Sequence, residues 1–174
     1  VMLGANASTG EWEDASLISS VSVAAKDGAW KEALTTAEQE LRRALDHGFT
    51  AAELKRQMAE TATAYRTAAE QADTRTSGSL ANSIISTIGE DSFVTTPAWR
   101  LASFEAAASG ITLEEVNAAF RRQWRGSAPL IHVSDKKRRA SREIAAAFRA
   151  SGRVAVAQTD NAATAAPHIR RRLR

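Results

Sequence analysis

Histidine, a common metal ligand in proteins, occurs three times in this chain, as His47, His132 and His168. None of them has a second histidine within a helical turn, so the sequence contains neither a His-Glu-x-x-His nor a His-x-x-Glu-His motif. It also contains no cysteine. Because a zinc site takes three or four His, Cys or carboxylate ligands, we predict no metal-binding residue in this chain.

Other catalytic patterns are also missing. The serines do not fall in a Gly-x-Ser-x-Gly elbow, and no Ser-His-Asp grouping follows from their spacing. Glycines occur singly, so no phosphate-binding Gly-x-Gly-x-x-Gly loop is present. The paired carboxylates Glu11 with Glu13 and Glu114 with Glu115 are typical of surface or helix-start charges. We therefore assign no catalytic and no cofactor-binding residue.

Two clusters of basic residues account for the isoelectric point near 9.7. Residues 168–174 contain four arginines, and removing these four positive charges lowers the net charge from +3 to −1. A second cluster comprises residues 136–139 with Arg142. Basic clusters can contact phosphates, but most are solvated surface, and no aromatic side chains that could stack on bases are interleaved here. The sequence therefore argues against nucleic acid as the main partner.

The composition sets the class of protein. Apolar residues make up 44% and charged residues 25% of the 174 residues, which is typical of a globular protein. Alanine supplies about a fifth of the chain and proline only three residues, a mixture that favours helices. No apolar run approaches the roughly 18 residues of a membrane span, so no membrane partner is expected. Val1 ahead of Met2 indicates a piece of a longer chain.

The first third of the chain changes from period two to period 3.6. Residues 1–15 are small and polar and predict a loop, whereas residues 17–25 alternate and predict a strand covered on one face. The turn Lys26-Asp27-Gly28 follows. From Ala29 a single apolar stripe predicts a helix that ends at His47, with Gly48 in the left-handed conformation that closes it.

The remaining elements are mostly helices. Thr50 to Glu53 has the form of a capping box and opens a helix to about Ala72. Further helices are predicted around residues 80–88, from Pro97 towards Gly110, from Thr112 through Trp124 and over 141–150, with short strands at 129–134 and 154–156. Two or three strands are too few for an independently stable sheet. The sequence therefore predicts a sheet that lacks strands.

Several junctions carry a resemblance to a known family. The strand and turn of residues 16–28 lead into Trp-Lys-Glu-Ala-Leu and then into residues 37–54, where His47-Gly48, Phe49-Thr50 and Glu53-Leu54 follow one another. This segment resembles the non-catalytic half-repeat of bacterial pitrilysin/insulinase-family zinc metallopeptidases. The helix break at residues 73–75, the helix start at 95–97 and the junction at 110–112 continue the likeness.

The resemblance covers about residues 1–157, and residues 158–167 resemble the linker to a next domain. It implies an α/β (α+β) domain, rich in helices that pack largely on one face of a small mixed or antiparallel sheet, within a clamshell that encloses peptides. We therefore expect two parts: residues 1–157 as a partial non-catalytic peptidase domain and residues 158–174 as a linker and basic tail. Zinc is expected in the parent protein, on a His-x-x-Glu-His motif and a downstream glutamate, and none in this chain.

The resemblance further implies that the parent is an enzyme that cleaves peptides and that this chain alone is not. Its expected partners are peptide substrates, through the clamshell, and other domains of the same polypeptide. A generic alanine-rich α/β domain is the simpler interpretation. A non-enzymatic helical interaction module, self-associating through uncovered sheet or helix surface, is the functional alternative. Nucleic-acid binding through the arginine tail is a third, weaker hypothesis. Localisation, bacterial periplasm or cytoplasm, stays open.

Overall fold

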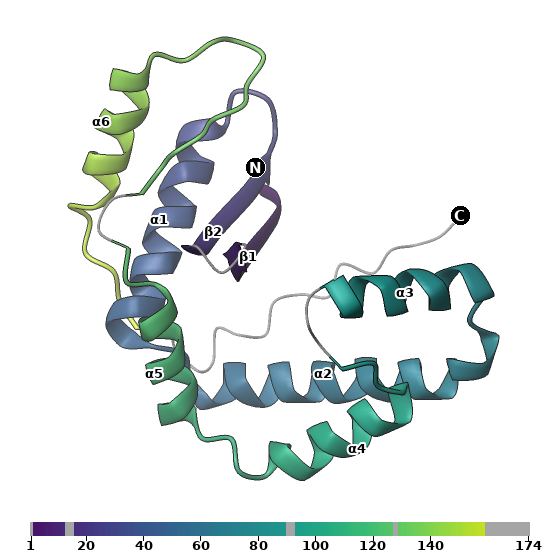
Figure 1. Ribbon diagram of the computed structural model, residues 1–174. Coiled ribbons are helices and arrows are strands. Elements are labelled where there is room, and N and C mark those ends of the chain that lie inside the picture. Colours follow the sequence, from purple (N-terminus) through teal and green to yellow (C-terminus); the bar gives the residue numbers. More distant parts are fainter. Residues whose placement is uncertain (1, 13–15, 90–92, 127–128, 159–174) are drawn as a thin grey trace, which may run out of the picture. The chain divides into compact units, whose positions relative to one another are not determined.

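A computed structural model describes residues 2–12, 16–89, 93–126 and 129–158 (Figure 1). Within these residues six α-helices accompany one two-stranded antiparallel sheet. The structure thus confirms the expected helix-rich α+β class with a small antiparallel sheet. The chain forms two compact units, the first from the described parts of Val1–Phe49 and Glu114–Arg174 and the second from Thr50–Leu113.

The sheet of the first unit is a hairpin of β1 (Met2–Trp12) and β2 (Ser16–Ala25). The prediction of a loop over residues 1–15 is wrong, because Met2–Trp12 is a strand whose Ala7 lies opposite Val21. Between Gly4 and Gly10 the side chains of β1 are small and uncharged, so its middle has no apolar alternation. The ladder of backbone hydrogen bonds to β2 holds β1 in place instead.

Helix α1 (Trp30–His47) follows β2 after a turn and supplies three of the six buried residues in the described part of the chain. The half-buried side chains of β2 alternate along the strand, at Ser19, Val21, Val23 and Ala25, as the sequence predicts. Trp30, Ala33 and Ala44 of α1 are the described buried apolar residues. Helix α5 (Leu113–Gln123) and helix α6 (Ser141–Ser151), which packs against α1, complete this unit (Figure 1).

The second unit is helical. It contains α2 (Ala51–Glu70), the short 3-10 turn η1 (Ala72–Thr74), α3 (Ser77–Gly89) and α4 (Pro97–Ala108). Helices α2 and α4 pack together, with the rings of Tyr65 and Phe104 centred 5.3 Å apart. The predicted capping box is present, since Thr50 and Glu53 exchange two hydrogen bonds. Pro97 stands in the first turn of α4, as expected, and Thr96 caps this helix.

The two later strands predicted from the sequence are wrong as sheet members. Residues 129–135 keep a period of two, with Ile131, Val133 and Asp135 half-buried and the residues between them exposed. They join no sheet, however, because no described strand pairs with them. At residues 154–156, a turn hydrogen bond from Val154 to Ser151 follows α6 directly. Among the described helices, none has both the length and the apolar character needed to cross a bilayer.

Candidate binding groove

A hollow of the first unit lies between the hairpin, α1 and residues 129–135. It has a volume of about 520 Å³. One wall is β2, the floor is the apolar stripe of α1 with Leu34, Ala37 and Leu41, and the opposite wall is the segment 129–135. Phe148 of α6 and Trp124 after α5 also line it. The lining is therefore mainly apolar and comes from four separate stretches of the chain.

One end of the groove is closed by the carboxylate of Asp135, whose side chain is 7% exposed. Arg139 binds this carboxylate with Nη2 2.6 Å and Nε 2.9 Å from Oδ2. The hydrogen bonds from Arg139, followed by those from the backbone N–H groups of Lys136 and Gly28, outweigh the opposing effect of burial and hold the pKa of Asp135 below its usual value. Asp135 therefore ties residues 129–135 to the turn after β2.

The same end carries two further contacts. The guanidinium of Arg139 lies 5.7 Å from the centre of the Trp30 ring, which places a cation over the first residue of α1. Lys136 also forms an ion pair with Asp27, and both side chains of that pair are exposed. An exposed ion pair contributes little, so Asp135 with Arg139 is the main fastening here.

The other end of the groove is fixed where α5 finishes. The hydroxyl of Ser19 in β2 donates to the carbonyl of Gln123 at 2.8 Å, and Thr9 of β1 donates to the side-chain oxygen of Gln123 at 3.3 Å. Residues 129–135 end beside the turn after β2, where Asp135 accepts from the N–H of Gly28. Both stretches run in the same direction, as Figure 1 shows.

The backbone edges that face each other across the groove are unpaired within the described residues. The described sheet contains β1 and β2 alone, so one edge of β2 pairs with β1 and its other edge has no strand partner. Residues 129–135 make no backbone-to-backbone hydrogen bond to any described residue. Because backbone N–H and C=O groups require partners, from protein or from water, this groove has two hydrogen-bonding walls.

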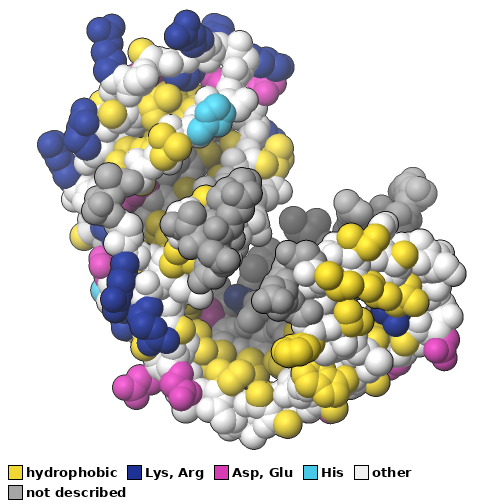
Figure 2. Space-filling model, in the orientation of Figure 1, with side chains coloured by type: hydrophobic (Ala, Val, Ile, Leu, Met, Phe, Trp, Pro, Cys, Tyr) yellow, Lys and Arg dark blue, Asp and Glu magenta, His cyan; other side chains and the backbone are white. Residues whose placement is uncertain are grey.

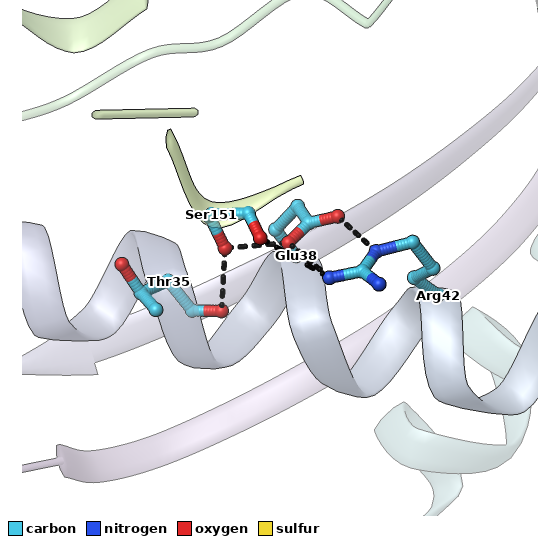
Figure 3. A network of polar contacts seen from close by, with 4 residues as sticks. All are labelled: Thr35, Glu38, Arg42 and Ser151. Atoms are coloured by element: carbon cyan, nitrogen blue, oxygen red, sulfur yellow. Dashed lines mark hydrogen bonds and ion pairs between the residues drawn. The ribbon is translucent and has the colours of Figure 1, made fainter. Parts of the chain in front are cut away.

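A polar network holds α6 against α1 behind the groove (Figure 3). The hydroxyl of Ser151, a residue that is 3% exposed, bonds to Glu38 and to the carbonyl of Thr35. Arg42 binds the same Glu38 at 2.7 Å and also donates to the carbonyl of Ser151. Partial burial raises the pKa of Glu38, but the hydrogen bonds from Arg42 and Ser151 outweigh it and lower the pKa overall.

Helix α5 is held against the end of α1 by Asn117. Its side-chain oxygen accepts from the N–H of Phe49 at 2.7 Å, and its amide nitrogen donates to the carbonyl of Phe49. The rings of Phe49 and Phe120 meet edge to face at 4.9 Å. Arg121 donates to the carbonyl of Leu45 at 2.9 Å. These contacts place the end of α5, and so the start of the segment after it, beside the hairpin.

The residues considered for metal binding do not come together. His47 donates from Nε2 to the carbonyl of Val156 at 3.0 Å, and His132 in the segment 129–135 is exposed. His168 lies outside the described residues, as do Glu13, the four terminal arginines and the predicted linker from residue 159 onward. In the described part of the chain no three His, Asp or Glu side chains are grouped as metal ligands. These residues do not fit a zinc ion.

The basic cluster at residues 136–142 lies on the surface around the start of α6, where Figure 2 shows Lys and Arg side chains gathered. Two of its cations form ion pairs within the chain, Arg139 with Asp135 and Lys136 with Asp27. The carboxylates Glu114 and Glu115 lie in the first turn of α5, as expected for helix-start charges. No local pattern indicates the roles of Asn117 and Ser151, because their partners are 68 and 113 residues away.

Comparison with protein-family models, curated proteins and solved structures found no match for this chain. The groove therefore has to be interpreted from its own residues and from the resemblance of the junction sequences.

Proposed function

We propose that this chain is a structural and substrate-enclosing domain of a zinc-dependent metalloendopeptidase of the pitrilysin/insulinase type. Catalysis belongs to a zinc domain outside these residues, as the resemblance implies. No catalytic, cofactor-binding or metal residue is assigned here, and the partners of the chain are peptide substrates and other domains of the parent.

The observation that carries the proposal is the junction between α1 and α2, on which the resemblance rests. Gly48 has φ of 75°, a conformation that favours glycine. Phe49 packs on Phe120, and Thr50 with Glu53 caps α2. Gly48, Phe49, Thr50 and Glu53 of the resembling junction thus each have a structural role. A helix-lined sheet with an open apolar groove also suits a domain that covers one side of a peptide chamber.

The decisive test uses the parent gene. Its full reading frame should encode a His-x-x-Glu-His motif, and the purified parent should contain zinc and cleave an unfolded peptide such as oxidised insulin B chain. A Glu→Gln change in that motif is the matched control, since it keeps the zinc ligands and removes the base. The isolated chain should contain no zinc by metal analysis. Stoichiometric zinc in the isolated chain, or a parent without the motif, would overturn the proposal.

A second candidate, a non-enzymatic helical interaction module, is favoured by the surface of α3. Ile85 and Ile88 are 68% and 67% exposed, and Leu80 on the same helix is 42% exposed. Figure 2 shows hydrophobic side chains gathered over this helix. Exposed apolar patches of this kind mark association sites. Light scattering of the chain and of an Ile85→Glu, Ile88→Glu variant tests it: association lost in the variant supports this candidate, and a monomeric unmodified chain rejects it.

A further inference from the structure

We propose that the groove between β2 and residues 129–135 is a slot for one more β-strand. The strand is an extended segment of the parent polypeptide, from outside these 174 residues, and it lies antiparallel to both walls. The origin of the strand rests on the proposed function, whereas the slot itself rests on the structure alone.

The direction of the two walls supports this arrangement. Asp135 at the end of the segment accepts from the N–H of Gly28 just after β2, and Figure 1 shows both stretches running in the same direction. The walls therefore run parallel, so a single strand between them can be antiparallel to both. Antiparallel pairs are the commoner arrangement and slightly the more stable one. The result is a four-stranded antiparallel sheet, enough strands to be stable when it packs on α1.

The hydrogen-bonding groups of the walls supply the binding energy. Both walls offer backbone N–H and C=O groups that no described residue pairs. In the open groove water satisfies these groups, and an inserted strand replaces that water on both of its sides. Residues 129–135 span about 23 Å when extended, so the slot takes a strand of about seven residues.

The lining defines the chemistry of the strand. Its inward side chains would face Leu34, Leu41 and Phe148, which are apolar. The acidic groups that line the groove are already neutralised, Asp27 by Lys136, Glu38 by Arg42 and Asp135 by Arg139. No unpaired carboxylate is thus left in the described lining to attract a basic side chain. The inward positions of the strand should be aliphatic or β-branched, at every second residue.

The test uses the intact chain of 174 residues and overlapping synthetic ten-residue peptides that cover the rest of the parent sequence. Binding is followed by the fluorescence of the tryptophans, because Trp30 and Trp124 line the groove, and by amide hydrogen exchange. One peptide with alternating apolar residues should bind saturably. It should slow exchange about tenfold or more in both β2 and residues 129–135, since both edges gain hydrogen bonds.

Two matched variants separate the slot from other surfaces. Val133→Asp places a carboxylate at a half-buried position of the segment, and His132→Asp places the same group at the neighbouring exposed position. Val133→Asp should weaken the peptide about tenfold or more, because the strand would bury an unpaired charge, and His132→Asp should change the affinity less than about threefold. Hydrogen exchange on the unmodified chain keeps the test informative if Val133→Asp does not fold.

Four outcomes overturn the inference: no peptide binds; the bound peptide protects β1 alone; a scrambled peptide binds equally well; or the chain dimerises and its groove amides are already protected without peptide. The scrambled-peptide result would show that any extended peptide fits, and the dimer result that a second copy fills the slot. If the parent lacks the zinc motif, the proposed function is wrong, but peptide binding in the groove still supports the slot. The failure of one proposal can therefore be distinguished from the failure of the other.

Discussion

The side-chain amide of Asn117 pairs with the backbone of Phe49 on both sides, accepting from its N–H and donating to its carbonyl. One side chain on α5 thus satisfies both polar groups of the residue that links α1 to α2. Because the two residues lie 68 positions apart in the sequence, this pair fastens α5 to the end of α1. The position of α5 in turn sets where the far wall of the groove begins.

Replacing Asn117 by alanine should destabilise the protein by about 1–3 kcal/mol, because the half-buried N–H and carbonyl of Phe49 both lose their partner. Urea unfolding followed by circular dichroism gives the change in free energy of unfolding. Asn82→Ala on the exposed face of α3 is the matched control and should stay within about 0.5 kcal/mol. Equal effects of the two variants would show that the Asn117 pair contributes nothing specific.

Gly48→Ala should be destabilising for two separable reasons. Gly48 has φ of 75°, which an alanine adopts at a cost of about 1 kcal/mol or more, and an added Cβ would lie 2.8 Å from the amide carbon of Asn117. Gly78→Ala, where a Cβ meets open space inside a helix, should be neutral or stabilising by up to about 1 kcal/mol. If the contact with Asn117 matters, the Gly48→Ala penalty should shrink in an Asn117→Ala background.

Stability should fall in acid through Glu38. The pKa of Glu38 in the folded protein lies below its ordinary value of 4.5, so the folded state binds fewer protons than the unfolded state around that pH. This contribution is full above pH 4.5 and is lost as the pH falls through the folded-state pKa. Glu38→Gln should flatten this part of the profile of urea midpoint against pH. If the urea midpoint of the variant falls with decreasing pH as steeply as that of the unmodified protein, other carboxylates cause the loss of stability in acid.

Thr50→Ala should cost about 1 kcal/mol, because it removes the acceptor for the N–H of Glu53 and breaks the capping box of α2. The control is Thr63→Ala in the middle of the same helix, where the exposed hydroxyl only bonds back to Ala59. Since alanine is the better helix former, that variant should be neutral or slightly stabilising. Thermal unfolding curves of both variants give the comparison.

Asp135→Asn should loosen the far wall of the groove, because the neutral amide binds Arg139 more weakly than the carboxylate does. We expect faster amide exchange in residues 129–135, with little change within α1. Asp27→Asn is the matched control, since Asp27 and Lys136 are both exposed and such pairs contribute little. Exchange that rises equally in both variants would contradict the role given to Asp135.

The sequence predicted the helices well because their signals are local. The cap at Thr50, the proline at position 97 and Gly48 with positive φ each lie within a few residues of the structure they set. Strand β1 was missed because the small side chains between Gly4 and Gly10 carry no alternating pattern, and the ladder to β2 identifies the strand. The hydrogen bonds that shape the groove, such as the one from Ser19 to Gln123, join residues far apart in the sequence. A local sequence pattern contains no information about such a partner, so these contacts could not be predicted.

The order of the units along the chain has a consequence for how the protein folds. The first unit is assembled from Val1–Phe49 and Glu114–Arg174, while Thr50–Leu113 forms the second unit entirely from contiguous residues. During synthesis the hairpin and α1 leave the ribosome long before α5 and α6. The apolar face of α1 therefore stays exposed to solvent until those two helices have been synthesised. Closing a flexible loop as long as residues 50–113 costs about 4 kcal/mol. Prior folding of the second unit would replace that loop with a rigid insert, and refolding should then begin there.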